Sequence, residues 1–219
     1  VVVHNVIAGG LEKTIIERLE MDPTKIKNLK LTGKITTEDY TFMRKKMTGL
    51  QRLNLKEVES VVDGVYVIPA GALTGKTTLV KCVLPDKLEA ICKCAFGETS
   101  LTGTVMLPEG LKYVSGFNST KITNVIFPST LETIGSGYDA DREYIYINGS
   151  FGGEYYGAFY SCKSLMCEII FPESLKKIGD NAFANSAIKG NLVFPHDLEN
   201  LGKSAFNQCS DLSGSLVIP

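Results

Sequence analysis

An internal repeat is the feature that most constrains how this chain can fold. In the complete units a proline is followed after three residues by Leu, after three more by a second apolar residue, and after four more by Ala-Phe. Units with this spacing start at Pro85, Pro172 and Pro195. A unit of this size cannot bury its own apolar side chains, so successive units must stack on one another. The repeat therefore predicts a solenoid, an architecture that presents long surfaces for binding.

The prolines also predict where strands end. Successive prolines of the repeat are separated by 23, 20, 44, 23 and 24 residues, and a period near 23 is typical of leucine-rich repeats. Proline lacks the N–H that a further rung of a strand ladder needs, so each apolar segment before a proline is predicted to be a strand that ends there. The predicted strands are 83–84, 105–107, 125–127, 169–171, 192–194 and 216–218.

The residues after each strand identify the kind of repeat. Ala-Phe pairs stand at 95–96, 158–159, 182–183 and 205–206, and Cys162 and Cys209 each follow their Phe by three residues. Two units are abbreviated, with Ala72-Leu73 and Gly116-Phe117 in this place. Over about residues 65–219 the chain resembles the BspA-like leucine-rich repeat family, bacterial surface proteins of the Bacteroidetes type. The resemblance implies adhesion to host proteins or to other bacteria, and a location outside the cell or on its surface.

The amino-terminal part follows the same plan with different details. The patterns Ile26-x-x-Leu29-x-Leu31 and Leu50-x-x-Leu53-x-Leu55 predict two more strands. Residues 37–46 between them predict a helix capped by Thr36 or Thr37. Before these, Leu11, Ile15, Ile16 and Leu19 predict the apolar face of a short helix.

The expected fold is therefore an α/β repeat solenoid of the leucine-rich-repeat type. We expect it to be right-handed and rich in β-strand, with an N-terminal helical cap over residues 1–24 and the solenoid over 25–219 as one domain. One inserted loop or hairpin interrupts it, because Ile134 reaches Ala158 only after 24 residues where other units need four.

The insertion, residues 138–157, is rich in tyrosine. Tyrosine combines a large apolar ring with a polar tip and is enriched in binding surfaces, and insertions in repeat proteins often emerge on the binding face. Alternatively, the rings only pin the loop onto the solenoid, and both interpretations stay open. The candidate ligand contacts are Tyr138, Tyr144, Tyr146, Phe151, Tyr155 and Tyr156.

Four other patterns carry weaker signals for chemistry. Residues 70–77 (AGALTGKT) resemble a phosphate-binding loop, with Lys76 in the place of its lysine, but a repeat strand follows where such a loop needs a helix. The pair Cys92 and Cys94 has no second pair with which to hold zinc. His196 is predicted to be an exposed turn residue, and Asp139 with Asp141 a solvated turn. We therefore predict no catalytic site, metal or cofactor, and a protein that is not an enzyme.

Composition narrows the partners. The formal net charge is −1, so nothing predicts a basic face for nucleic acid, and no apolar run is long enough to span a bilayer. The six cysteines fit repeat positions and are expected to be free thiols. Val1 is not an initiator Met, so a processed form without its signal peptide is expected. The strand that ends at Pro219 has no cover, which predicts a longer natural chain or an edge-to-edge contact.

Three functions remain open at this stage. The first is a non-enzymatic module for protein–protein interaction and adhesion at the cell surface, whose partners are host extracellular or bacterial surface proteins. The second is a structural spacer that displays another domain. The third is a glycan-binding module that uses the aromatic faces of the insertion.

Overall fold

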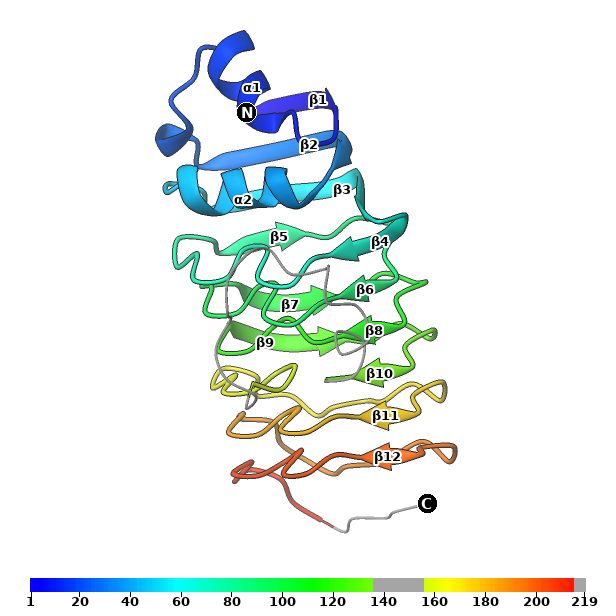
Figure 1. Ribbon diagram of the computed structural model, residues 1–219. Helices are drawn as coiled ribbons and strands as arrows, with labels where there is room; N and C mark the ends of the chain where they lie inside the picture. Colours follow the sequence, from blue (N-terminus) through cyan, green and yellow to red (C-terminus); the bar gives the residue numbers. More distant parts are fainter. Residues whose placement is uncertain (136–155, 215–219) are drawn as a thin grey trace.

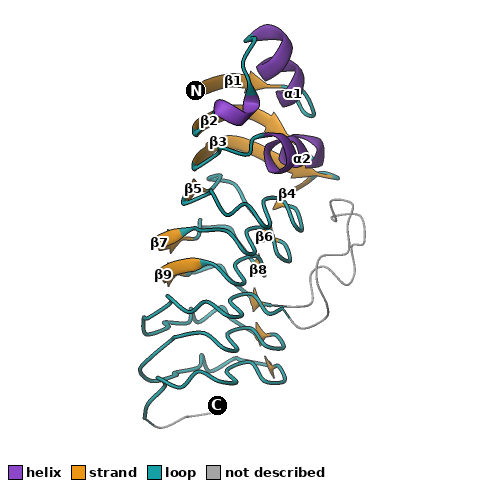
Figure 2. Cartoon of the chain, turned by 90° about the vertical axis from the view of Figure 1, so that its left-hand side faces the viewer, coloured by secondary structure: helices purple, strands orange, loops and turns teal. Residues whose placement is uncertain are grey.

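A computed structural model describes residues 1–135 and 156–214, in which the chain winds through coils stacked along one axis (Figures 1 and 2). Helices are few and lie near the amino terminus. The elements in chain order are β1 (Val2–Val6), α1 (Leu11–Lys13), a π-helical turn (Thr14–Arg18), a 3-10 turn (Pro23–Lys25), β2 (Asn28–Ile35), α2 (Thr37–Lys46), β3 (Arg52–Val62), β4 (Val65–Ile68), β5 (Lys81–Val83), β6 (Ala90–Ile91), β7 (Thr102–Met106), β8 (Tyr113–Val114), β9 (Lys121–Ile126), β10 (Thr133–Ile134), β11 (Lys177–Ile178) and β12 (Asn200–Leu201).

The strands form rows on two sides of the stack (Figure 2). One side carries the parallel strands β1, β2, β3 and β5, and then the separate parallel pair β7–β9. The other side carries β4, β6, β8, β10, β11 and β12, all parallel. The first row contains predicted strands, whereas the second was not predicted. It is built from the second apolar residue of each repeat, such as Ile91 and Ile178.

Two of the strand predictions were wrong. Residues 169–171 form no strand, and of residues 192–194 only Val193 makes a β-bridge. At the last position before the proline, Phe127 stacks on Phe171 with ring centroids 6.3 Å apart, and Phe171 on Phe194 at 5.7 Å. Backbone hydrogen bonds still join these coils just before the two segments, as from the Lys189 N–H to the Cys167 carbonyl at 3.0 Å, but no continuous ladder follows.

The two rows are joined by the one antiparallel pair described, β3–β4. Val62 pairs with Val65 across a two-residue turn. Both turn residues, Asp63 and Gly64, have positive φ angles of 49° and 80°. This is the geometry of a type I′ turn, for which Asp-Gly is a favoured sequence. The hairpin is where the long strand β3 leaves the first row and the chain enters the second.

The amino-terminal part contains a strand that was not predicted, β1, which pairs in parallel with β2. The predicted helix is only partly present, as α1 and the π-helical turn after it. Leu11 and Ile15 are buried as expected, but Ile16 and Leu19 are 44% and 43% exposed. The π-helical turn accounts for this difference, because widening the helix rotates later residues away from the face that a regular helix would bury.

Helix α2 begins and ends as predicted, and Asp39 in its first turn joins it to the amino-terminal segment. The backbone N–H of Thr36 donates to Asp39 Oδ2 at 2.9 Å, which closes a capping box. The same carboxylate accepts N–H groups from Gly9 at 2.8 Å and from Leu11 at 2.9 Å. Asp39 is buried, and these three donors supply the hydrogen bonds that a buried carboxylate requires.

The core of the repeats is a column of stacked phenylalanines. The four consecutive centroid distances are 5.1, 5.7, 5.2 and 5.4 Å, with interplanar angles of 4° to 14°. Each ring comes from the Phe of one repeat, so the period in the sequence becomes a continuous aromatic column in space. The rings belong to Phe96, Phe117, Phe159, Phe183 and Phe206.

Each coil is also hydrogen-bonded to the next through a turn beside this column. The residue two positions after Leu73 or the column Phe has a positive φ in all six coils. In the first five of these coils its N–H donates to the following coil, as from Ser119 to the Tyr160 carbonyl at 2.7 Å. Only one of these residues is Gly, so we infer that the bond offsets the strain of a left-handed residue. They are Gly75, Glu98, Ser119, Ser161, Asn185 and Gln208.

Candidate functional site

The third residue after Leu73 or each column Phe forms a second column, made of small or polar buried side chains. Here the hydroxyls of Thr99 and Thr120 donate to the carbonyls of Phe96 and Phe117, both at 2.8 Å. These bonds satisfy backbone carbonyls that the turns would otherwise leave buried without a donor. The column consists of Lys76, Thr99, Thr120, Cys162, Ser186 and Cys209.

The two cysteines of this column occupy equivalent positions, as predicted. Cys162 Sγ lies 3.1 Å from the carbonyl of Phe117, and Cys209 Sγ 3.1 Å from that of Phe183. Burial raises the pKa of the Cys162 thiol to about 11. All six cysteines are thiols in the structure. Cys162 and Cys209 thus serve as small, partly apolar members of the core.

Lys76 belongs to the same column, and this explains the resemblance to a phosphate-binding loop. It is only 6% exposed, and its Nζ donates to the carbonyl of Met47 at 2.7 Å, at the end of α2. The carbonyls that a helix leaves unpaired at its end accept this hydrogen bond. Residues 71–75 form turns and no helix follows them. The segment is therefore a repeat turn whose lysine closes a helix.

The other candidates for chemistry do not converge on one place. His196 is exposed and lies 2.8 Å from Asp197, its chain neighbour, whose hydrogen bond raises the pKa of the imidazole. Cys92 and Cys94 are both buried. Within 1–135 and 156–214, no group of three or more His, Cys, Asp or Glu side chains could hold a metal ion. In the same residues no helix has the length and apolar character needed to cross a bilayer.

Of the candidate ligand contacts in the insertion, only Tyr156 lies within the described residues. Its ring packs edge-on against Tyr160, with centroids 5.4 Å apart. This contact agrees with the interpretation that aromatic residues pin the end of the insertion to the coils. Tyr138, Tyr144, Tyr146, Phe151 and Tyr155 lie outside the described residues, as do Asp139 and Asp141.

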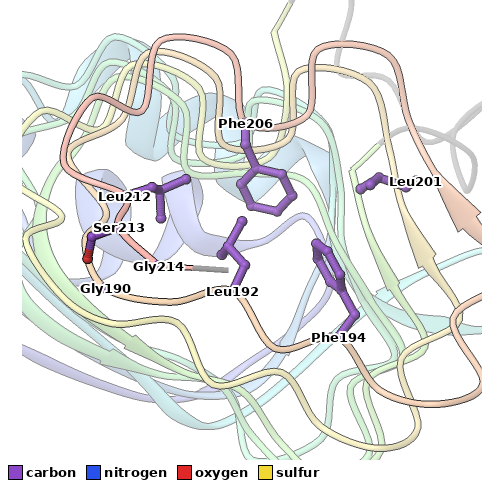
Figure 3. Close-up of a pocket in the computed structure, with 8 residues that line it drawn as sticks. All are labelled: Gly190, Leu192, Phe194, Leu201, Phe206, Leu212, Ser213 and Gly214. Carbon is purple, nitrogen blue, oxygen red and sulfur yellow. The ribbon is translucent and has the colours of Figure 1, made fainter. Parts of the chain in front are cut away.

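Two of the hollows on the described surface lie along the repeats. One, of about 310 Å³, lies between β5 and β7, where the first row of strands is interrupted. The other, of about 230 Å³, lies at the last described coil, where Leu192, Phe194 and Phe206 converge (Figure 3). It is the end of the aromatic column. The predicted strand 216–218, with the edge contact expected of it, lies outside the described residues.

The coils also present the outward side chains of each strand in rows. In the second row of strands, from β6 to β12, the residue before each strand alternates in charge from coil to coil, and Lys112 lies 4.0 Å from Glu132. Alternating charges avoid like-charge repulsion between neighbouring coils. The row runs Glu89, Lys112, Glu132, Lys176 and Glu199.

Comparison with known protein families identifies the family of these repeats. The model of the BspA type leucine-rich repeat region matches residues 66–146 and 155–218, in six copies. The chain belongs to the BspA-type leucine-rich repeat family. The match covers most of the chain and confirms the resemblance inferred from the Ala-Phe spacing. It begins within β4, so the coils of β2 and β3 lie before the matched BspA-type repeats.

One solved structure shares the fold. A leucine-rich repeat protein from Bacteroides ovatus ATCC 8483 is 22% identical, with a TM-score of 0.53 over 87% of this chain and 49% of that one. The chain thus spans about half the length of that protein. A leucine-rich cell surface protein from Faecalibacterium prausnitzii A2-165 is 16% identical, with a TM-score of 0.31 over 96% of this chain and 75% of that one. A search of curated proteins finds no match.

Proposed function

We propose that this BspA-type repeat chain is a non-enzymatic module for protein–protein interaction at the surface of a bacterium, acting in adhesion to host or bacterial proteins. The observation that supports the proposal most is the regular repetition of the coil. Phenylalanines stack at 5.1 to 5.7 Å through five coils, so outward side chains are held in straight rows on a preformed surface. Preformed surfaces lose little entropy on binding.

The described side chains also favour binding over catalysis. Lys76 and Cys162 are buried residues whose side chains could act in catalysis, but both are hydrogen-bonded to backbone carbonyls of the coil stack. A catalytic group would need access to a substrate and a partner that activates it. Membership of the BspA-type family adds the expectation of a location outside the cell.

The test is a binding screen of the purified chain against extracellular-matrix proteins, bacterial surface proteins and glycans. A variant in which residues 138–157 are replaced by a short Gly-Ser linker is run beside it. The proposal expects saturable binding of at least one protein by the intact chain. Loss of that binding in the deletion variant assigns the contact to the insertion, and its retention assigns it to the coil surface.

The two alternatives make different predictions in the same screen. A spacer binds nothing in either form, and that outcome would contradict the proposed function. A glycan module binds sugars rather than proteins, and its tyrosine fluorescence changes on addition of the sugar. Tyr156 packs edge-on against Tyr160, so we place protein binding ahead of sugar stacking at this end of the insertion.

A further inference from the structure

Four exposed apolar side chains form a stripe along the first row of coils. Each stands two residues before a proline, and they are Met106, Ile126, Ile170 and Val193. Their exposed fractions are 70%, 47%, 82% and 71%. Single exposed apolar residues are ordinary, but a contiguous row of them is typical of an interaction surface. We call these four residues the apolar stripe.

The structure places the four residues in register. Met106 and Ile126 are directly paired across β7 and β9. For the later coils, the residue that follows each stripe residue points inward, and Phe127, Phe171 and Phe194 stack in turn. Neighbouring residues of an extended segment point to opposite sides. The stacked rings beneath therefore align Ile126, Ile170 and Val193 on the outer side.

The stripe is limited to the repeats that match the family. In the amino-terminal sheet the equivalent row runs through Val2, Lys30, Asn54 and Val83, by direct pairing of β1, β2, β3 and β5. Polar side chains interrupt that row. Strand preference alone therefore does not explain the apolar residues of the stripe, because Lys30 and Asn54 occupy the same outward position in the amino-terminal sheet.

The surroundings of the stripe are acidic. Each of the four segments is taken from four residues before its proline to one residue after it. Together they contain Glu109, Glu168 and Glu173, one histidine, His196, and no Lys or Arg. All three glutamates are exposed. The chain as a whole has 23 Lys and Arg against 24 Asp and Glu, so this is a local departure from balance. Acidic borders oppose binding to nucleic acid or to an anionic lipid surface.

We infer that the apolar stripe is a docking surface for a cationic amphipathic segment of a partner protein, with apolar side chains on the stripe and Lys or Arg beside the glutamates. This inference rests on the proposed function and names the surface and the chemistry of the partner. Charge complementarity selects a basic partner. A second copy of this chain is a poorer occupant. In an antiparallel face-to-face pairing, the acidic borders of the two copies would lie near each other and repel.

The experiment measures binding of a fluorescently labelled synthetic peptide of alternating leucine and lysine by anisotropy. A peptide of alternating leucine and glutamate is the charge control. The stripe variant carries Met106→Gln, Ile126→Thr, Ile170→Thr and Val193→Thr, in which Thr keeps the preference for extended backbone. The matched control variant carries Ile7→Thr and Ile16→Thr, which removes exposed apolar side chains at the other end of the chain.

The expected result is binding of the leucine–lysine peptide that the stripe variant weakens by about tenfold or more, as expected when several apolar groups leave a contact. The control variant binds like the original chain. Glu168→Gln with Glu173→Gln weakens binding and reduces its dependence on salt. Methyl NMR of the unmodified chain shows shifts at Ile126 and Ile170, a readout that does not depend on the folding of any variant.

Three outcomes would overturn the inference. One is equal binding of the leucine–glutamate peptide, and another is undiminished binding by the stripe variant. The third is self-association of the chain that the stripe variant abolishes, because the occupant would then be a second copy. If the screen for the proposed function finds a protein that binds the stripe variant as well as the original chain, the docking surface fails while the proposed function stands.

Discussion

The ammonium of Lys76 donates a hydrogen bond to the carbonyl of Met47 at 2.7 Å, and this bond joins the first family repeat to the end of helix α2. The contact is the counterpart of the one between Cys162 and Phe117 further along the stack. In both, the third residue after Leu73 or a column Phe reaches the carbonyl of the preceding coil. At Lys76 the preceding coil ends in helix α2 rather than in a repeat turn, and the long lysine side chain takes the place of the short cysteine.

Lys76 should make stability depend on pH in a recognisable window. Burial lowers its pKa from 10.5 to about 8. Between these values the unfolded chain holds the proton and the folded chain does not, so the free energy of unfolding due to this group rises with pH. The free energy of unfolding of the original chain minus that of Lys76→Met should therefore increase with pH across the window, by at most about 1.4 kcal/mol for each pKa unit.

Urea denaturation of both proteins below and above this window measures the effect. The buried thiols work in the opposite direction at high pH, since burial raises the pKa of Cys82 to about 12. They are common to both proteins and cancel in the difference. Lys121→Met, at an exposed position, is the matched control. A stability difference that is constant across the window would show that Lys76 keeps an ordinary pKa.

Removing one ring from the aromatic column should destabilise the stack strongly. Phe159 is fully buried and stacks on Phe117 at 5.7 Å and on Phe183 at 5.2 Å. We expect Phe159→Ala to lower the free energy of unfolding by about 3–5 kcal/mol, the cost of a large cavity in a packed core. Chemical denaturation checks this. Phe206→Ala, in the last described coil, should cost less, and an equal cost for both would contradict the column as a continuous core.

The amino-terminal segment should depend on the carboxylate of Asp39. Asp39→Ala leaves the N–H groups of Gly9, Leu11 and Thr36 without their acceptor. We expect a loss of about 1–3 kcal/mol, the cost of a buried donor left unpaired, because the Leu11 hydrogen bond is buried and the other two are part-buried. Hydrogen exchange at Leu11 should accelerate before exchange in the later coils does. Asp22→Ala, at an exposed carboxylate, should leave exchange at Leu11 unchanged.

Cys162 should resist alkylation in the folded chain. The thiolate is the reactive form, and burial keeps the pKa of this thiol at about 11. Mass spectrometry after brief treatment with iodoacetamide should show modification of Cys167, which is partly exposed, well before Cys162. Urea should bring the two rates together. Rapid modification of Cys162 in the native protein would mean that the coils around it open readily.

The periodic part of the fold could be predicted because it depends on spacing alone. The Ala-Phe pairs at fixed distances from each proline predicted the stacked coils, and Cys162 and Cys209 were placed correctly in equivalent buried positions. The helix after Thr36 was also recognised from local signals. For the candidate site the sequence predicted less. Tyr156 is the one described member of the tyrosine set, and the apolar stripe was not recognised because exposure is invisible in a repeat pattern.

The sequence by itself determined the period of the coil and the residues of the aromatic column, since each is a matter of distance along the chain. The tertiary structure alone decided which apolar segments became strands. Residues 169–171 and 192–194 are not strands although they read like 105–107, because a ladder depends on how a segment meets the neighbouring coil, which spacing along the chain does not show. It also decided the role of Lys76, because only the folded chain brings the end of α2 to its ammonium.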